Sequence, residues 1–273
     1  MQQRKIAFIG AGNMTRSIIS GLVANGYPAE LIMASNPSIG KLEALHSDFA
    51  IQTTQDNNLA LEFAEVVVLA VKPQLMEQVC AALAKHQPLA GKLFVSIAAG
   101  LPTARLQQML QGHETIIRTM PNTPSALGKG MTGLFAEPMI QAADKQFAGD
   151  LMAQVGEIAW VDKESLIDSV IAAAGSSPAY FFLFLEAMQK EAEQQGFDHH
   201  TARLLVQQAM LGAAEMVCHN PQLELSALRT QVTSKGGTTA KAIESFQQQG
   251  LEKVVATAMQ AAVKRAEEMA NLF

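Results

Sequence analysis

The sequence predicts an α/β domain followed by an all-α domain, and three observations support this. Short β-branched segments alternate with amphipathic stretches through the first half of the chain. These segments disappear after Asp162, and only helical patterns follow. The chain has 273 residues, a length typical of about two domains. We therefore expect residues 1–162 to form the α/β domain and residues 163–273 to form the helical domain.

Seven short apolar runs are the expected strands of the first domain, and helical stretches such as Ser17–Asn25 and Gln74–Lys85 separate them. The strands are Lys5–Ile9, Leu31–Ala34, Glu65–Val71, Leu93–Ala98, Thr115–Thr119, Met131–Phe135 and Glu157–Val161. The segment 66–71 is continuously apolar, as a central strand covered on both faces should be. The alternation of strands and helices predicts right-handed βαβ units and an open parallel sheet.

Four long helices are expected in the second domain. They are Pro178–Gln195 with Ser177 as its N-cap, a helix from the N-cap Asp198 to about Cys218, Thr239–Gln249 and Glu252–Leu272. The apolar stretch Val170–Met188 should be interrupted at Gly175–Pro178. A membrane span needs an uninterrupted apolar run, so we expect a buried helix there and no membrane partner.

The helix at 178–195 predicts self-association. Its first half, Tyr180–Leu185, is apolar almost all the way round, and a helix without a polar face must be enclosed on every side. The helical domain is too short to enclose it easily, so we predict an obligate dimer through this domain. The alternative is a core helix enclosed within a single chain.

Composition excludes several classes of protein. Apolar residues make up 49% of the chain, charged residues make up 16%, and the net charge is −5. This balance allows a packed core and excludes a disordered chain. Without a basic cluster we expect no nucleic acid partner. The two cysteines, Cys80 and Cys218, form no CxxC pair, which indicates neither a disulfide framework nor a zinc site and fits a reducing cytoplasm.

A glycine-rich turn follows the first expected strand and opens a helix. Its sequence is Gly10-Ala11-Gly12-Asn13-Met14-Thr15. Gly10 permits a tight turn and Gly12 lets the backbone approach a pyrophosphate, toward which the first N–H groups of the helix point. The position predicts a Rossmann-like dinucleotide site that includes Gly10, Gly12, Asn13 and Met14. The alternative is an ordinary strand–helix turn. Thr15 stands where Gly or Ala is usual, so we expect a slightly wider helix–strand distance.

The second expected strand ends in Ser35-Asn36-Pro37-Ser38, without a carboxylate. Sites for NAD place a carboxylate here, and it would repel a 2′-phosphate. Hydroxyl groups, an amide and the nearby Lys41 would accept that phosphate. We therefore predict NADPH as the cofactor, with NADH as the alternative, and Ser35 and Asn36 as cofactor contacts. The same residues also fit a turn that only caps the next helix.

Two later strand ends extend the predicted cofactor site. Ligands of open α/β sheets bind at the carboxyl ends of the strands, which assigns Val71, Lys72, Pro73, Ala98, Ala99 and Gly100 to the cofactor. Lys72 is alternatively a plain surface cation. The next strand end, Arg118–Pro124, contains two prolines. It forms a stiff loop, suited either to holding a carboxamide or substrate or to no ligand at all.

A second glycine turn precedes the expected helix near residue 240. Gly236 and Gly237 allow a nest of backbone N–H groups, which with the helix dipole could hold a carboxylate. Ser234, Thr238 and Thr239 would add hydroxyl groups. A plain Gly-Gly loop capped by threonine would give the same pattern.

Together, these motifs resemble those of the pyrroline-5-carboxylate reductases over nearly the full chain. The matching segments are Ile9–Met14, Ala70–Pro73, Ala98–Gly100, Met120–Pro124, Gly175–Tyr180 and Thr233–Ile243. The resemblance implies a Rossmann domain and a helical domain that interlocks into a dimer, with decamers in many members. It also implies NAD(P)H-dependent reduction of the cyclic imine 1-pyrroline-5-carboxylate to L-proline, the final step of proline biosynthesis.

The resemblance further implies the roles of individual residues. Thr239 falls on the family's threonine that hydrogen-bonds the ring nitrogen of the substrate, which makes it the catalytic residue. Asn57 falls on a cofactor-contacting position. The family's Gly-Ser-Gly-Pro is Gly-Ser-Ser-Pro at 175–178 here. The substrate-binding residues implied are Glu164, Ser234, Gly236, Gly237, Thr238 and Thr239.

Two other functions stay open. An oxidoreductase like the β-hydroxyacid dehydrogenases usually employs a helical lysine, but the first lysine after Gly175 is Lys190, which lies too far along. A non-catalytic NADP-sensing binding protein would need the cofactor site without the nest at 236–239. NADPH oxidation, measured first with the pyrroline substrate and then with hydroxy acids, separates the three functions.

Overall fold

The protein is described by a computed structural model, which covers residues 1–86, 89–270 and 272. The chain forms two compact units, one of Met1–Ser176 with Ala261–Phe273 and the other of Ser177–Gln260. This division differs from the predicted boundary at 162/163. The segment before Ser177 packs with the sheet, and the last turns of the final helix also belong to the first unit.

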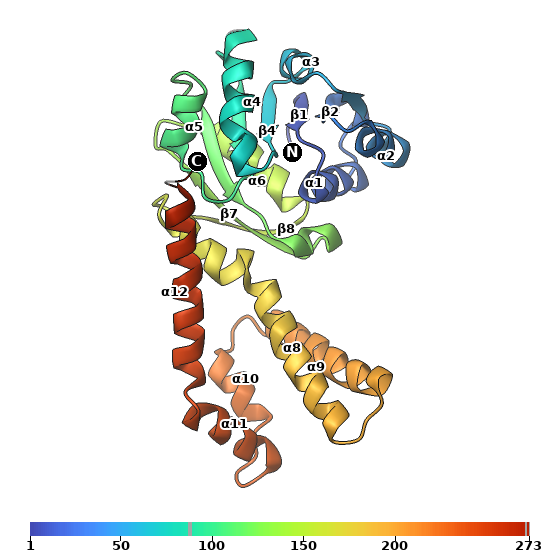
Figure 1. The fold of residues 1–273 in the computed structure, drawn as a ribbon, viewed down its shortest axis with the longest axis vertical. Coiled ribbons are helices and arrows are strands. Elements are labelled where there is room, and N and C mark those ends of the chain that lie inside the picture. The colour runs from blue at the N-terminus through green and yellow to red at the C-terminus, as the bar shows by residue number, and fades with distance from the viewer. Residues whose placement is uncertain (87–88, 271, 273) are drawn as a thin grey trace. The chain divides into compact units, whose positions relative to one another are not determined.

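The first unit contains an eight-stranded sheet in the order β3-β2-β1-β4-β5-β6-β7-β8 (Figure 1). The strands are β1 (Ile6–Ile9), β2 (Ile32–Ser35), β3 (Gln52–Thr54), β4 (Val66–Leu69), β5 (Leu93–Ser96), β6 (Ile116–Met120), β7 (Gly130–Ala136) and β8 (Gly156–Trp160). All seven predicted strands are confirmed, with ends shifted by one or two residues. β3 was not predicted, because three polar residues carry no apolar pattern.

The prediction of an entirely parallel sheet was wrong at one position. β1 to β6 pair in parallel, but β7 runs antiparallel to β6, and β8 is parallel to β7. Only residues 121–129 connect β6 to β7, and their regular structure is the single 3₁₀ turn η2 (Thr123–Leu127). A parallel connection needs a crossover of a dozen or more residues, so this short loop can only reverse the chain.

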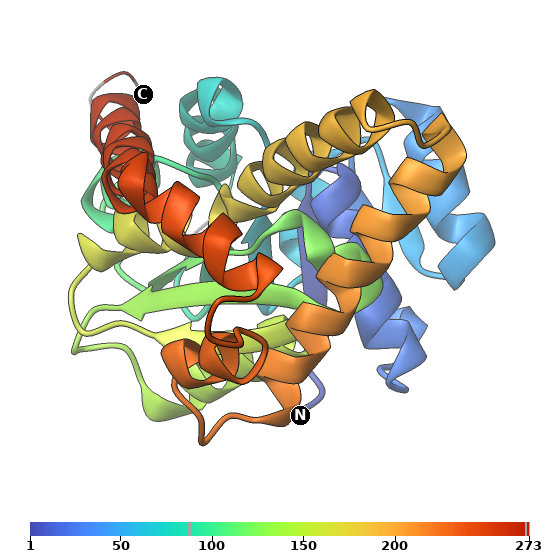
Figure 2. The same cartoon turned by 90° about the horizontal axis from the view of Figure 1, so that it is seen from below.

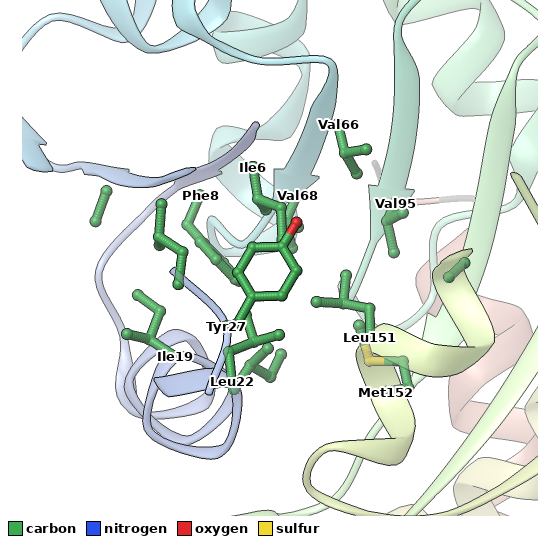
Figure 3. Packing of buried hydrophobic residues seen from close by; sticks show 14 of the residues in the cluster. Ile6, Phe8, Ile19, Leu22, Tyr27, Val66, Val68, Val95, Leu151 and Met152 are labelled. Carbon is green, nitrogen blue, oxygen red and sulfur yellow. The ribbon is translucent and has the colours of Figure 1, made fainter. Parts of the chain in front are cut away.

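Helices cover both faces of the sheet. They are α1 (Asn13–Ala24), α2 (Ile39–Phe49), α3 (Asn57–Phe63), α4 (Pro73–His86), α5 (Thr103–Met109), α6 (Ala142–Ala153) and α7 (Leu166–Val170), with the 3₁₀ turn η1 (Ala29–Leu31). Side chains along a strand alternate between faces. Phe8 therefore joins a core with α1 and α6, in which Leu22 and Leu151 also lie (Figure 3). Ala7 and Ile9 join the core on the opposite face, with α3, α4 and α5.

The second unit is helical, as predicted. Its helices are α8 (Ser177–Gln194), α9 (His199–His219), α10 (Leu225–Gln231), α11 (Thr238–Gln248) and the first part of α12 (Leu251–Ala270). α8 and α9 form a hairpin of two long helices (Figure 2). The Asp198 cap of α9 is confirmed, because its side chain accepts hydrogen bonds from the N–H groups of His200 and Thr201. The short helix α10 was not predicted.

The expected interruption at Gly175–Pro178 is confirmed in part. α7 passes into a π-helical turn, η3 (Ile171–Gly175), and a bend at Ser176 separates this turn from α8, which begins at Ser177. Proline lacks the N–H that would bond the carbonyl four residues earlier. Here that carbonyl, of Ala174, accepts a hydrogen bond from the Asn122 side chain instead, so Pro178 leaves no acceptor unsatisfied.

The interruption is small. By length and composition, Leu166–Gln194 could still cross a membrane. No residue of α8 is buried, and Phe182 and Leu183 are 64% and 68% exposed. The alternative of a core helix enclosed within one chain was therefore wrong. Its apolar surface needs a cover that a single chain does not provide.

Candidate functional site

The turn between β1 and α1 has the geometry that an anion site requires. Gly10 has φ +112°, and a Cβ there would lie 2.5 Å from the Ala70 carbonyl oxygen, so only glycine fits. Gly12 is the N-cap of α1, and a Cβ there would meet nothing within 4 Å. The first turn of α1 contains no acidic residue. Its N–H groups are therefore open to an anion beside Gly12.

Thr15, the departure from the usual motif, stabilises this turn. Its side chain is fully buried, and its Oγ1 donates a hydrogen bond of 2.8 Å to the Gly10 carbonyl oxygen. A buried hydroxyl costs little when it is hydrogen-bonded. Thr15 thus ties the first turn of α1 back to the end of β1. The wider helix–strand distance expected from its size stays a prediction.

Three predicted cofactor residues meet at the end of β2. The Ser35 carbonyl oxygen accepts a hydrogen bond of 2.8 Å from the Gly10 N–H, and Asn36 Oδ1 accepts one of 3.3 Å from the Ala11 N–H. Ser35 Oγ donates to Asn57 Oδ1 at 2.6 Å, which brings the start of α3 to the same place. The group contains hydroxyl and amide side chains and no carboxylate.

The ends of β4 and β5 lie at the same edge of the sheet. Ile9 of β1 is in register with Leu69, and Leu69 is in register with Ser96. Since these strands are parallel, Val71–Pro73 and Ala98–Gly100 follow at the edge where the β1–α1 turn lies. Pro73 begins α4, which fixes the backbone on which the exposed Lys72 sits.

The loop after β5 is held in a defined shape. The Ile97 N–H donates to the Leu69 carbonyl oxygen at 3.2 Å, and the Ala98 N–H donates to Ser96 Oγ at 3.3 Å. Gly100 has φ +73°, and a Cβ there would lie 2.8 Å from Cβ of Met269, in the last turns of α12. Gly100, one of the small residues predicted to face a cofactor, is therefore also required by packing.

Asn122, in the loop after β6, forms its hydrogen bonds within the protein. It is buried, its Nδ2 donates to the Ala174 carbonyl oxygen at 3.0 Å, and its Oδ1 accepts from the Met131 N–H at 2.9 Å. These bonds connect the loop to the π-helical turn and to β7. Of the two predicted alternatives for Arg118–Pro124, the geometry favours a rigid loop without a ligand on this amide.

Both carboxylate oxygens of Glu164 are also hydrogen-bonded within the protein. Its Oε1 accepts hydrogen bonds from the Thr103 N–H at 2.6 Å and from Arg118 Nη1 at 3.3 Å. Its Oε2 accepts one from the Thr103 hydroxyl at 2.9 Å. Arg118 also donates to Asp168 at 2.9 Å and is itself only 2% exposed. Sequence reasoning missed this cluster, although a charged residue within an apolar strand signals a buried partner.

In the second unit, the predicted substrate residues form one turn at the start of α11. The Gly237 N–H donates to the Ser234 carbonyl oxygen at 3.0 Å, and Gly236 has φ +75°. Gly237 is the N-cap, and a Cβ there would lie 2.5 Å from Ser234 Oγ. The first turn carries no acidic residue, and both Thr238 and Thr239 are exposed. The turn thus offers N–H groups and hydroxyl groups to an anion.

The predicted residues therefore fall into two sets. The cofactor set lies at one edge of the sheet in the first unit, and the glycine turn at 234–239 lies in the second. Glu164 belongs to the first set's unit and not to the glycine turn.

Other chemistry has little support in the described part of the chain. No group of three or more His, Cys, Asp or Glu residues there could hold a metal ion. Burial raises the pKa of the Cys80 thiol to about 12, so this cysteine stays protonated and is a poor nucleophile. His199 is exposed and interacts with Glu193, whose pKa hydrogen bonds from Gln189 and His199 lower.

A parallel Rossmann-type sheet with a glycine turn at the start of α1, followed by a helical unit, defines a nucleotide-dependent oxidoreductase. Two family models match. Residues 5–100 match "NADP oxidoreductase coenzyme F420-dependent", and residues 164–269 match "Pyrroline-5-carboxylate reductase dimerisation". The second match covers the whole second unit, Ser177–Gln260, and extends past both of its ends.

Whole-chain comparisons identify the family. The chain is 59% identical to a pyrroline-5-carboxylate reductase of Vibrio alginolyticus over all 273 residues, which cover 100% of both proteins. The solved reductase of Coxiella burnetii shares 41% identity with a TM-score of 0.93, over 98% of this chain and 99% of that one. The Plasmodium falciparum pyrroline carboxylate reductase, solved with NADP bound, shares 27% identity with a TM-score of 0.85, over 99% of both chains. This chain belongs to the pyrroline-5-carboxylate reductase family.

Proposed function

We propose that this chain reduces the cyclic imine 1-pyrroline-5-carboxylate to L-proline, with NADPH as the hydride donor. The observation that carries the proposal is the presence of two glycine turns, at Gly10–Gly12 and Gly236–Gly237, in a chain that is 59% identical to a pyrroline-5-carboxylate reductase over its whole length. The first turn fits a pyrophosphate and the second fits a carboxylate. Neither a hydroxyacid dehydrogenase nor a non-catalytic NADP-sensing protein would need both turns.

The residues of the first unit fit a dinucleotide cofactor. The N–H groups after Gly12 would hold the pyrophosphate, in the space that a glycine leaves open there. Ser35, Asn36 and Asn57 would lie beside the adenosine ribose, and the absence of a carboxylate among them favours NADPH over NADH. The loops at 71–73 and 98–100 would hold the nicotinamide side. When bound, NADPH supplies the hydride.

The turn in the second unit would hold the substrate. The N–H groups of Gly236 and Thr238 would bind the carboxylate, with Ser234 Oγ close by, while the Gly237 N–H holds the shape of the turn through the Ser234 carbonyl oxygen. Thr239 would hydrogen-bond the ring nitrogen. Glu164 would be a further substrate contact. Its carboxylate oxygens accept hydrogen bonds from Thr103, and each oxygen can accept a second one.

The reduction does not require a strong acid from the protein. A protonated imine is already electrophilic, so the carbon that receives the hydride needs no strong acid beside it. A threonine hydroxyl is far too weak an acid to donate a full proton near neutral pH, so Thr239 would orient the nitrogen or relay a proton from water. The main contribution of the chain would be to hold the reactants in a productive orientation.

We further propose that the chain acts as an obligate dimer through α8 and α9, with decamers as the larger assembly. The exposed apolar residues of α8 lie within the segment that matches the dimerisation model, 164–269. A second copy of the chain, rather than a lipid bilayer, would therefore cover them. The free thiols of Cys80 and Cys218 fit action in the cytoplasm.

The decisive experiment follows the absorbance of NADPH with 1-pyrroline-5-carboxylate and with hydroxy acids. We expect turnover of the pyrroline only. Thr239→Ala should lower kcat by about 10- to 100-fold, the usual range for losing a positioned proton-transfer group. Because Thr239 is exposed, its Tm should not change, and Thr239→Ser should restore most of the activity. Turnover of hydroxy acids, or an unchanged kcat in Thr239→Ala, would contradict the assignment.

A further inference from the structure

We propose that Arg118 is a positioning residue for the reduction, which fixes the carboxylate of Glu164 so that its Oε2 faces the ring nitrogen of the substrate. The inference rests on the proposed function, in which Glu164 contacts the substrate. It goes beyond that function because Arg118 itself would touch neither the substrate nor the cofactor. It would act only through the carboxylate that does.

Arg118 is a costly residue for its place in the fold. It lies in β6, where it is 2% exposed and follows the buried residues Ile116 and Ile117. Its Nε is buried and has no hydrogen-bond partner among the described residues, and an unsatisfied buried donor destabilises a fold. Replacing a buried ion pair by apolar packing is often neutral or stabilising. Stability alone therefore does not account for an arginine in this strand.

The hydrogen bonds of the Glu164 carboxylate leave one acceptor site open. A carboxylate has about four such sites, shared equally by its oxygens. Thr103 fills one on each oxygen, with its N–H to Oε1 at 2.6 Å and its hydroxyl to Oε2 at 2.9 Å. Arg118 Nη1 fills the second site of Oε1 at 3.3 Å. Without Arg118 both oxygens would have a vacant site, so Arg118 is what leaves Oε2 as the free acceptor within the described contacts.

This free acceptor lies where the proposed function requires the substrate. The Glu164 side chain is 22% exposed and that of Arg118 only 3%, so a ligand can reach the carboxylate but not the guanidinium. Thr103, which holds Glu164, is the first residue of α5 and comes shortly after Gly100. The loop at 98–100 is the one proposed to hold the nicotinamide side of the cofactor. Oε2 would therefore lie near the hydride donor.

The charge of this cluster favours the ring nitrogen of the substrate over its carboxylate. Asp168 accepts a second hydrogen bond from Arg118, at 2.9 Å. The ion pairs of Arg118, as far as the structure describes the chain, thus join one cation to two carboxylates, which leaves one negative charge uncompensated. That charge would repel the substrate carboxylate and attract a protonated ring nitrogen. L-proline carries the same nitrogen in a charged form and is a stable probe of this contact.

The test compares inhibition by L-proline with inhibition by cyclopentanecarboxylate, which has a similar ring and the same carboxylate but no nitrogen. In Arg118→Met, the inhibition constant for L-proline should rise about tenfold or more, the effect of losing an aligned bond to a charged group. The KM for the pyrroline should rise with it. The constant for cyclopentanecarboxylate should stay near its wild-type value, because that ligand has no donor for Oε2. A general collapse of the site would instead weaken both ligands equally.

Asp168→Asn is the matched control, because it breaks the other ion pair of Arg118 and keeps the bond to Glu164. It should lower Tm, as Arg118→Met does, but keep the wild-type constant for L-proline. The double variant Arg118→Met/Asp168→Asn separates position from charge, since it again has a single uncompensated carboxylate. If Arg118 sets the position of Glu164, L-proline should bind about tenfold more weakly than to the wild type in the double variant too. If Arg118→Met alone does not fold, the double variant gives the same comparison.

Three results would each overturn the inference. They are an unchanged constant for L-proline in Arg118→Met, equal losses for L-proline and cyclopentanecarboxylate, and recovery of L-proline binding in the double variant. A wild-type chain that fails to turn over the pyrroline would contradict the proposed function itself. Normal wild-type turnover with any of the three results would contradict the inference alone.

Discussion

The two compact units bury their apolar side chains to very different extents. In the first unit, every residue of β1 and β4 is buried, and both faces of the sheet carry a core. In the described part of the second unit, the buried apolar residues are Ala202, Val206 and Leu228. α8 and α11 bury no residue at all.

The two units therefore obtain their stability in different ways. Burial of apolar surface is the main favourable term in folding, and the first unit obtains it from its own sheet and helices. The second unit leaves Phe181, Phe182 and Leu183 at least 60% exposed on α8. Its helices therefore depend on a cover outside the chain, and a unit that is incomplete alone is well suited to joining two copies.

The largest effect should come from breaking that cover. Leu183→Asp removes an apolar contact and places a charge in the proposed dimer interface. Since a two-fold interface contains the change twice, we expect a loss of about 4 kcal/mol, or a ~1000-fold weaker dimer. Sedimentation analysis at several concentrations would measure it.

Leu127→Asp is the matched control, because Leu127 is 81% exposed in the first unit. This variant should associate like the wild type. Unchanged association of Leu183→Asp would show that α8 is covered in some other way, and an equal loss in both variants would place the interface on both units.

Smaller effects are expected from substituting the two glycines of the β1–α1 turn, and the two substitutions should change different properties. Gly10→Ala combines a positive φ with a Cβ only 2.5 Å from the Ala70 carbonyl oxygen, so it should destabilise the fold by about 2 kcal/mol. Gly12→Ala meets no protein atom within 4 Å. It should keep the wild-type Tm and weaken NADPH binding, because the methyl group fills the space proposed for the pyrophosphate.

Denaturant unfolding and NADPH fluorescence titration measure the two quantities independently. A wild-type affinity for NADPH in Gly12→Ala would move the pyrophosphate away from this turn. A wild-type stability in Gly10→Ala would mean that the turn adapts at little cost.

The smallest expected effect is on the pH dependence of the stability of the first unit. Burial lowers the pKa of His113, although hydrogen bonds to the Lys92 and Thr115 backbone and the nearby Glu114 oppose this. The folded pKa thus lies below the unfolded value, so the stabilisation is present above about pH 6.5 and declines as the pH falls through that value toward the folded pKa. The Tm of His113→Asn should therefore depend less on acid than that of the wild type. His199→Asn, at an exposed site of the second unit, is the control, and equal pH slopes in wild type and His113→Asn would refute the prediction.

Most of the structural features that could be predicted depend on patterns of neighbouring residues. The strands of the first unit follow continuous apolar runs, and the Asp198 cap and the glycines at 10 and 12 act on atoms within a few residues of themselves. β3 carries no such pattern, because it exists only through pairing with β2. The partner of the Ala174 carbonyl could not be predicted for a related reason, since it is Asn122, 52 residues earlier.

The residues of the candidate site also differ in how far the sequence could predict them. The glycine turns were predictable, because a positive φ and an open helix start are properties of a few consecutive residues. The hydrogen bonds of Glu164 were not, since its partners Thr103 and Arg118 lie 61 and 46 residues away. Only the arrangement of the sheet brings those groups together.

Periodicity and glycine geometry are properties of neighbouring residues, so the sequence was enough to predict the class of each unit, the two glycine turns and the family. Only the folded chain shows the reversal of β7, the burial of Arg118 between two carboxylates and the exposure of α8. These depend on contacts between distant segments, and a distant contact forms only when the whole fold supplies both partners.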